Sequence, residues 1–273
     1  MAGDEATAAA TSRKSEIAGL SPDFHIWEGV YPSFAEARAV GAGFNGPTHK
    51  ARATAAARAA LDSVRAGKPI PLLLKQRSAV LPPVVACALS QSSAIRVLDF
   101  GGGLGIGYLA LIETIPQISS KLEYQVVDLP EVCDSGRSLF RDVQNLTFSE
   151  ALPPVLPAPT IVYSSSAIQY VESWRDLLEK LTSYRAESIL LSDVFAGNVP
   201  TFCSLQNYYD SKVPQWFFNI DELVECVAAA GYRLQMKSRA VVTLLDRDDG
   251  PPMENFPVTH RIPETLHLLF HRI

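Results

Sequence analysis

A carboxylate followed by a run of glycines ends an apolar segment near the middle of the chain. The segment 95–100 contains Asp99, and four glycines follow it: Gly101, Gly102, Gly103 and Gly105. Glycine adopts positive φ angles freely and has no side chain, so such a loop lets a ligand lie against backbone N–H groups. A strand that ends in this loop, with a helix after it, is typical of nucleotide-like cofactor sites. The pattern therefore predicts a cofactor pocket.

The spacing of the glycines separates the candidate cofactors. The dinucleotide fingerprint G-x-G-x-x-G needs a third glycine where Ile106 or Tyr108 stands, and no P-loop lysine follows. The pattern is instead Asp99-x-Gly101-x-Gly103-x-Gly105, which resembles motif I of class I S-adenosylmethionine (SAM)-dependent methyltransferases. SAM has no pyrophosphate, and its amino-acid end suits backbone groups and a carboxylate. We therefore expect SAM as cofactor, S-adenosylhomocysteine as product and no metal.

This resemblance implies further cofactor-binding residues where later strands end. Asp128 closes the next expected strand, and a carboxylate there can accept both ribose hydroxyls. Phe148, Ser149 and Glu150 follow the third strand, where such enzymes receive adenine, and Ser164 follows the fourth. Three plainer interpretations remain open: the glycines form a structural turn, Asp128 only precedes a helix, and Ser164 is a polar strand end.

The elements that position these residues alternate from residue 95 onward. Expected strands cover 95–100, 124–127, 146–148, 160–163, 188–191, 233–245 and 265–272, with helices between most of them. This order predicts an α/β fold with a Rossmann-like, seven-stranded, mostly parallel sheet whose last strand is antiparallel. Residues 1–20 are expected to be a disordered leader, 21–94 a helical cap with a helix from Pro47 to Arg65, and 95–273 the SAM-binding methyltransferase domain.

A second resemblance covers most of the chain from Trp27. The chain is similar to a largely uncharacterised group of methyltransferases that is often associated with bacterial surface-polysaccharide biosynthesis. The shared segments are W-E-G-V-Y at 27–31, V-L-D-F-G-G-G-L-G at 97–105, S-A-I-Q-Y-V at 166–171, Q-W-F-F-N at 215–219 and A-G-Y at 230–232. One departure is Asp128-Leu129-Pro130, where Glu-Gln-Pro is expected. The resemblance implies methyl transfer without naming the acceptor.

Catalysis requires the acceptor atom, the methyl group and sulfur to be aligned, and a hydroxyl acceptor also benefits from a general base. Asp193 at the end of the fifth strand and Glu28 in the cap are the expected bases, with His25 and His49 as alternatives. A structural, hydrogen-bonding role for Asp193 also stays open. A set of aromatic and amide side chains is expected to bind the acceptor: Trp27, Tyr31, Gln169, Tyr170, Tyr208 and Trp216. Burial of the cap against the sheet is the simpler interpretation of most of these aromatics.

Charge and composition limit the partners. The net charge is −5 and the sequence pI is near 5.6, which disfavours nucleic acid and anionic membranes. The four cysteines form no C-x-x-C pair, so we expect free thiols and a cytoplasmic protein. The expected function is methyl transfer to a small molecule at a hydroxyl oxygen, with a sugar or glycoconjugate precursor as one candidate; nitrogen and carbon acceptors stay open. A non-catalytic SAM-binding protein, a nicotinamide-dependent oxidoreductase and a homodimer stay open.

Overall fold

The structure is a computed structural model that describes residues 23–244 and 250–273. The predicted leader, residues 1–20, lies outside the described residues, as does Leu245 at the end of the predicted strand 233–245.

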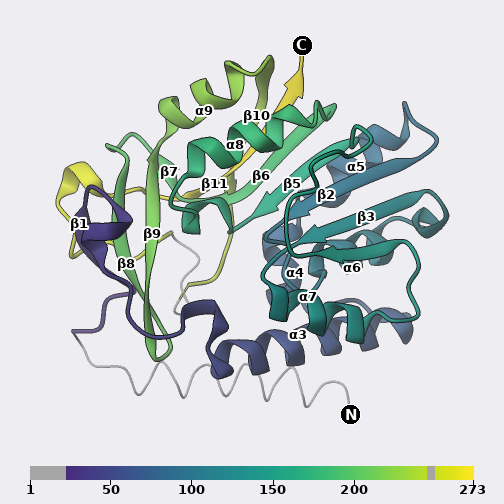
Figure 1. Ribbon diagram of the computed structural model, residues 1–273, viewed down its shortest axis with the longest axis horizontal. Helices are drawn as coiled ribbons and strands as arrows, with labels where there is room; N and C mark the ends of the chain where they lie inside the picture. The colour runs from purple at the N-terminus through teal and green to yellow at the C-terminus, as the bar shows by residue number, and fades with distance from the viewer. Residues whose placement is uncertain (1–22, 245–249) are drawn as a thin grey trace.

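The centre of the molecule is a seven-stranded sheet in the order β10-β11-β6-β5-β2-β3-β4 (Figure 1). Strand β11 pairs antiparallel with both of its neighbours, and the other pairs are parallel. The predicted fold class is therefore confirmed. The strands are β2 (Ile95–Phe100), β3 (Leu122–Val127), β4 (Leu146–Ser149), β5 (Ile161–Ser165), β6 (Ser188–Val194), β10 (Tyr232–Ala240) and β11 (Thr265–Arg272).

Helices cover both faces of this sheet, because successive strand residues point to opposite sides. Val97 belongs to the hydrophobic cluster shared with α3 (Pro47–Arg65), α5 (Leu81–Leu89), α6 (Ile106–Thr114) and α7 (Pro130–Leu139). Its neighbour Leu98 belongs to the cluster under α8 (Trp174–Ser183) and α9 (Ile220–Ala228). Figure 1 shows α8 and α9 on one side of the sheet and α3, α6 and α7 on the other.

The helix ends follow local signals in the chain. Pro47 opens α3, where its missing N–H has no helical partner to lose. Ser33 accepts a hydrogen bond from the Glu36 backbone N–H and caps the short helix α2 (Phe34–Ala37). The Asn219 side chain accepts from the first N–H groups of α9. The remaining short helical segments are η1 (Gly43–Asn45), α4 (Leu72–Lys75), η2 (Gln76–Ser78), η3 (Ile118–Ser120), η4 (Ile168–Tyr170) and η5 (Val258–His260).

A second sheet, in the order β1-β8-β9-β7, corrects two local expectations. The segment 21–94 is not helical throughout, because β1 (Trp27–Tyr31) pairs with β8 (Phe202–Tyr208). The segment after β6, where no strand is expected before residue 233, contains a hairpin of β8 and β9 (Ser211–Asn219), preceded by β7 (Ala196–Gly197). Its aromatic residues pack on Trp27 and on residues that follow β10, in a cluster that includes Phe217.

Within residues 23–244 and 250–273, no single helix is long and apolar enough to cross a membrane. The bent pair 72–78 and 81–89 reaches that length and composition only when its two parts are taken together.

Trp27 holds β1 in place, so its truncation should be costly. The side chain is 1% exposed, its Nε1 donates to Gln215 Oε1 at 2.9 Å, and its ring packs edge-on against Phe195 and Phe217. We expect Trp27→Ala to lower the free energy of unfolding by about 3–5 kcal/mol. Val30→Ala on the same strand is the control, since Val30 is 39% exposed. Chemical denaturation measures both, and equal stability of the two variants would contradict the packing described.

Candidate active site

The glycine loop lies directly over the end of β2. Gly101, Gly103 and Gly105 all have positive φ, at 68°, 57° and 75°. Gly102 is required for another reason, because a Cβ there would lie 2.4 Å from Asp99 Oδ2. Helix α6 begins immediately after Gly105. The loop therefore brings bare backbone against the Asp99 carboxylate.

Asp99 is a buried carboxylate in which one of the two oxygens accepts a hydrogen bond from the described residues. The side chain is 1% exposed, and the Tyr124 hydroxyl donates to Oδ2 at 2.6 Å. Oδ1 has no hydrogen-bond partner among the described residues. Burial is the main cause that raises the pKa of Asp99 to about 7, with Asp128 adding to the effect and Tyr124 opposing it. A cationic group of a ligand would supply the missing partner.

Asp128 lies at the end of β3 and fixes the glycine loop from its other side. Oδ2 accepts from the Gly103 backbone N–H at 2.8 Å, and Oδ1 accepts from the Leu129 N–H at 2.7 Å. Burial raises the pKa of this carboxyl above its usual value. Each carboxylate oxygen keeps a second lone pair, so both can still accept a hydrogen bond from a hydroxyl group.

These groups line a cavity of about 860 Å³, a volume suited to a cofactor with a small second ligand. The cavity extends from the glycine loop to the second sheet. It brings together nine of the predicted site residues: Asp99, Gly101, Gly103, Asp128, Glu150, Asp193, Trp27, Tyr170 and Tyr208.

Eight predicted residues do not line this cavity: Gly105, Phe148, Ser149, Ser164, Glu28, Tyr31, Gln169 and Trp216. The Phe148 ring points into the core, where it stacks on Phe140 and lies so close to Gly136 that no Cβ would fit there. Ser149 accepts a hydrogen bond from Gln125 at 2.8 Å. At this edge of the sheet, Glu150 faces the cavity.

The other residues outside the cavity have structural contacts. Trp216 stacks on Phe34. Gln169 is buried and donates to the Asp193 carbonyl at 3.4 Å. Ser164 is 2% exposed, and Tyr31 packs on the main hydrophobic core.

Glu28 lies in an ion pair on β1. Its carboxylate accepts from Lys212 Nζ at 2.5 Å and from Asn207 Nδ2 at 2.5 Å. The hydrogen bond from Lys212 is the main cause that lowers the pKa of this carboxyl. Both the location and the pairing of Glu28 disfavour the predicted role as a base.

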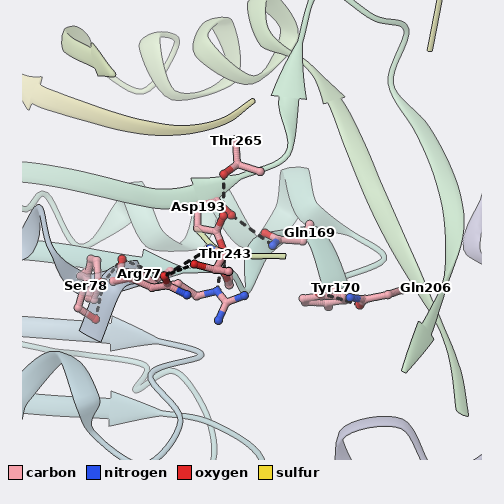
Figure 2. Close-up of polar contacts among 12 residues, drawn as sticks. Arg77, Ser78, Gln169, Tyr170, Asp193, Gln206, Thr243 and Thr265 are labelled. Atoms are coloured by element: carbon pink, nitrogen blue, oxygen red, sulfur yellow. Dashed lines mark hydrogen bonds and ion pairs between the residues drawn. The ribbon is translucent and has the colours of Figure 1, made fainter. Parts of the chain in front are cut away.

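Asp193 does face the cavity, but both oxygens of its carboxylate already accept hydrogen bonds (Figure 2). Thr265 donates to Oδ1 at 2.8 Å, while Arg77 Nε donates to Oδ2 at 2.8 Å and the Ser166 hydroxyl also donates to Oδ2. The residue has a positive φ of 50°, which turns the side chain at the end of β6. An ion-paired carboxylate with three donors is better suited to hold Arg77 than to accept a proton.

His49 lies on the opposite wall of the cavity, in α3. Its Nδ1 forms a hydrogen bond of 2.5 Å with the Tyr208 hydroxyl, and Phe44 packs against both rings. Burial lowers the pKa of His49, so the imidazole is neutral at physiological pH. His49 was one of the alternative bases expected from sequence, and the structure places it beside Tyr208.

Arg77, Phe44 and Gln206 also line the cavity and were not among the predicted site residues. No motif surrounds any of them, and long-range contacts alone bring them to the cavity. Within the described parts of the chain, no group of three or more His, Cys, Asp or Glu side chains could hold a metal ion.

The raised pKa of Asp99 leads to a testable prediction. Because the folded state raises the pKa of this carboxyl to about 7, the stability gained by keeping it protonated is lost as the pH rises through that value. We therefore expect Asp99→Asn to stabilise the ligand-free protein at pH 8, on the order of 2–4 kcal/mol, and much less at pH 5. Thermal unfolding across pH measures this. Glu123→Gln, at an exposed carboxylate on β3, should leave the profile unchanged.

Known proteins show the same fold with little sequence identity. No family model and no curated protein matches the chain. The 1,6-didemethyltoxoflavin-N1-methyltransferase of Burkholderia thailandensis, solved with 1,6-didemethyltoxoflavin and S-adenosylhomocysteine, matches with a TM-score of 0.50 and 15% identity over 89% of this chain and 99% of its own. The magnesium protoporphyrin IX methyltransferase of Synechocystis, solved with SAM, matches with a TM-score of 0.48 and 12% identity over 84% of this chain and 93% of its own. An amino pentose methyltransferase of Micromonospora echinaspora matches at 0.47 and 12% identity over 78% and 96%. The chain thus has the Rossmann-like fold of class I methyltransferases.

Proposed function

We propose that the protein is a SAM-dependent methyltransferase that acts on a hydroxyl oxygen of a small-molecule acceptor. The observation that carries this proposal is Oδ1 of buried Asp99, which has no hydrogen-bond partner in the part of the chain that the structure describes and lies beneath a glycine loop that opens into a large cavity. A buried carboxylate oxygen without a partner costs stability, and a bound cationic group offsets that cost.

The residues around the glycine loop fit SAM. Asp99 and the backbone of Gly101 would hold the amino-acid end, and Asp128 would accept the ribose hydroxyls. Adenine would lie beside Glu150, near Leu129, which also line the cavity at this edge. When bound, SAM supplies an electrophilic methyl group on a positively charged sulfur. The remaining chemistry belongs to the protein: it orients the acceptor, excludes water and accepts one proton.

The acceptor would occupy the part of the cavity that faces the second sheet. Its walls there include Phe44, Tyr170 and Tyr208, whose rings pack edge-on around Phe44. Flat rings of this kind can pack on the C–H face of a sugar or stack on a planar acceptor. We also propose a sugar or a glycoconjugate precursor as the acceptor. The support for this is the resemblance of the chain to the group with the W-E-G-V-Y segment, which is often associated with polysaccharide biosynthesis.

The proton of the acceptor hydroxyl would pass to the His49–Tyr208 pair. If Nδ1–H of His49 donates to the Tyr208 oxygen, Nε2 has a free lone pair; in the other tautomer, Tyr208 relays the proton to Nδ1. Burial keeps the imidazole neutral and therefore able to act as a base. Asp193, expected from sequence as the base, would instead position Arg77.

Binding of the cofactor is the first test. Calorimetric titration should show SAM and S-adenosylhomocysteine binding, and Asp128→Ala should weaken both by about 10- to 100-fold, since hydrogen bonds to a charged group are lost. Asp134→Ala on the exposed side of α7 is the matched control. Binding of NAD(P) without SAM would refute the proposal, and SAM binding without label transfer to any of a wide range of acceptors would favour a non-catalytic SAM-binding protein.

Replacement of the base is the second test. With an acceptor in hand, His49→Gln should lower kcat by about 10²-fold or more. In the wild type, kcat should fall only as the pH drops below the ordinary histidine pKa of 6.5, because burial lowers the pKa of His49 and the charged form cannot accept a proton. This acid limb should vanish in the variant. His271→Gln, on the exposed end of β11, is the control; an unchanged limb in His49→Gln would assign the base elsewhere.

A further inference from the structure

Arg77 lies in the short segment η2, which is hydrogen-bonded to residues at the carboxyl ends of β5 and β6. Its backbone carbonyl accepts from Ser165 Oγ at 3.1 Å and from the Tyr163 hydroxyl at 3.4 Å. The preceding residue, Gln76, is buried and accepts from Thr243 N at 3.3 Å. The backbone that carries the guanidinium is therefore fixed on two sides before any ligand enters.

The Arg77 side chain is held at one end and open at the other. Nε–H donates to Asp193, and Asp193 is itself 2% exposed and fixed by Thr265 and Ser166. The Arg77 side chain is 42% exposed and lines the cavity. A guanidinium has five N–H donors. Among the residues that the structure describes, the two Nη groups of Arg77 have no hydrogen-bond partner. The Nη edge of the guanidinium, in the lining of the cavity, can therefore donate hydrogen bonds to a ligand.

The groups around the open edge are aromatic and neutral. Figure 2 shows Tyr170 and Gln206 across from the guanidinium, with the Tyr170 hydroxyl donating to Gln206 Oε1 at 2.9 Å. The Arg77 charge acts on both Tyr170 and Tyr208. The other carboxyl groups that line the cavity belong to the glycine loop and its flank: Asp99, Asp128, Glu131 and Glu150. Among the described residues, Asp193 is thus the carboxylate on the acceptor side of the cavity, and it is already paired.

The electrostatic partners of the Arg77 guanidinium lie on the acceptor side of the cavity. The charge that acts on Asp99 is that of Asp128, and Arg77 is not among the groups that shift its pKa. The groups on which Arg77 acts are Asp193, Tyr170 and Tyr208, at the end of the cavity that faces the second sheet. A carboxylate on the acceptor is therefore a closer match to the open edge than the carboxylate of the cofactor.

We propose that Arg77 binds a carboxylate of the methyl acceptor through its two Nη groups, so that the substrate class is the hydroxylated carboxylic acids. This proposal rests on the function proposed above. The planar fork of a guanidinium matches the two oxygens of a carboxylate, and both hydrogen bonds are charge-assisted. Asp193 is a positioning residue, because it holds Nε and leaves the opposite edge free. Tyr170 and Phe44 would flank the body of the acceptor.

Matched ligand pairs test the proposal. A panel of hydroxy acids, headed by 4-hydroxybenzoate and methyl glucuronoside, is titrated beside its uncharged counterparts, 4-hydroxybenzamide and methyl glucoside. Binding is measured by saturation-transfer NMR and calorimetry, with saturating S-adenosylhomocysteine and without it. We expect at least one acid to bind the loaded protein about tenfold or more tightly than its counterpart. Arg77→Gln should abolish this preference, while Arg77→Lys should keep part of it.

Two further variants separate positioning from folding. Asp193→Asn keeps the size of the side chain but removes the charge that holds Nε, so the preference for acids should fall while the affinity for S-adenosylhomocysteine stays unchanged. This variant also serves if Arg77→Gln does not fold. Arg175→Gln removes an exposed guanidinium that pairs with Glu222 outside the cavity, and it should behave as the wild type.

Several outcomes would overturn the proposal. The first is that no acid binds, or that acids and neutral counterparts bind equally. The second is that Arg77→Gln weakens S-adenosylhomocysteine but not methylthioadenosine, which lacks the cofactor's carboxylate; Arg77 would then belong to the cofactor site. Failure of the proposed function looks different. In that case the wild type binds no S-adenosylhomocysteine, whatever the ligand-free protein does with the acids.

Discussion

The arrangement of the site depends on one buried carboxylate. Asp99 lies beneath the glycine loop with one oxygen bonded to Tyr124 and the other without a partner among the described residues. The residues that pack on this carboxylate and on Tyr124 must be glycines. A Cβ at Gly102 would lie 2.4 Å from the carboxylate, and a Cβ at Gly107 would lie at the same distance from the Tyr124 hydroxyl. The loop, the start of α6 and the core side of β3 are thus fitted around a charge that costs stability until a ligand neutralises it.

A second constraint fixes the acceptor side of the cavity. Asp193 ends β6 and is bonded to Thr265 at the start of β11, so two antiparallel strands of the main sheet fix one carboxylate. That carboxylate holds Arg77, which comes from the segment before β2. The cofactor side is therefore defined by strand ends, whereas the acceptor side is assembled from three separate regions of the chain. Such an assembly allows the acceptor to change between related proteins while the cofactor loop remains the same.

The sequence predicted the elements whose formation depends on interactions between residues close together in the chain. The strand Ile95–Phe100 has the expected bounds, and a helix, Ile106–Thr114, follows the glycine loop, because an apolar run, glycines and a helix start lie in one continuous stretch. The strand at Trp27 was missed, since its pairing partner is Gln206, far along the chain, and no local turn signals it. Phe148 was placed at adenine because its position after a strand is visible in sequence, whereas its direction into the core against Gly136 is not. Arg77 could not be found, because the ion pair that reveals it joins residues 116 positions apart.

The pairing of β1 with the hairpin also has a consequence for the order in which the chain folds. Trp27 and its hydrogen-bond partner Gln215 are 188 residues apart, so this contact closes one of the longest loops in the molecule. During synthesis, β1 leaves the ribosome early and has no strand to pair with until most of the Rossmann-like sheet has been made. We expect the main sheet to form first and the wall behind the acceptor to be completed late.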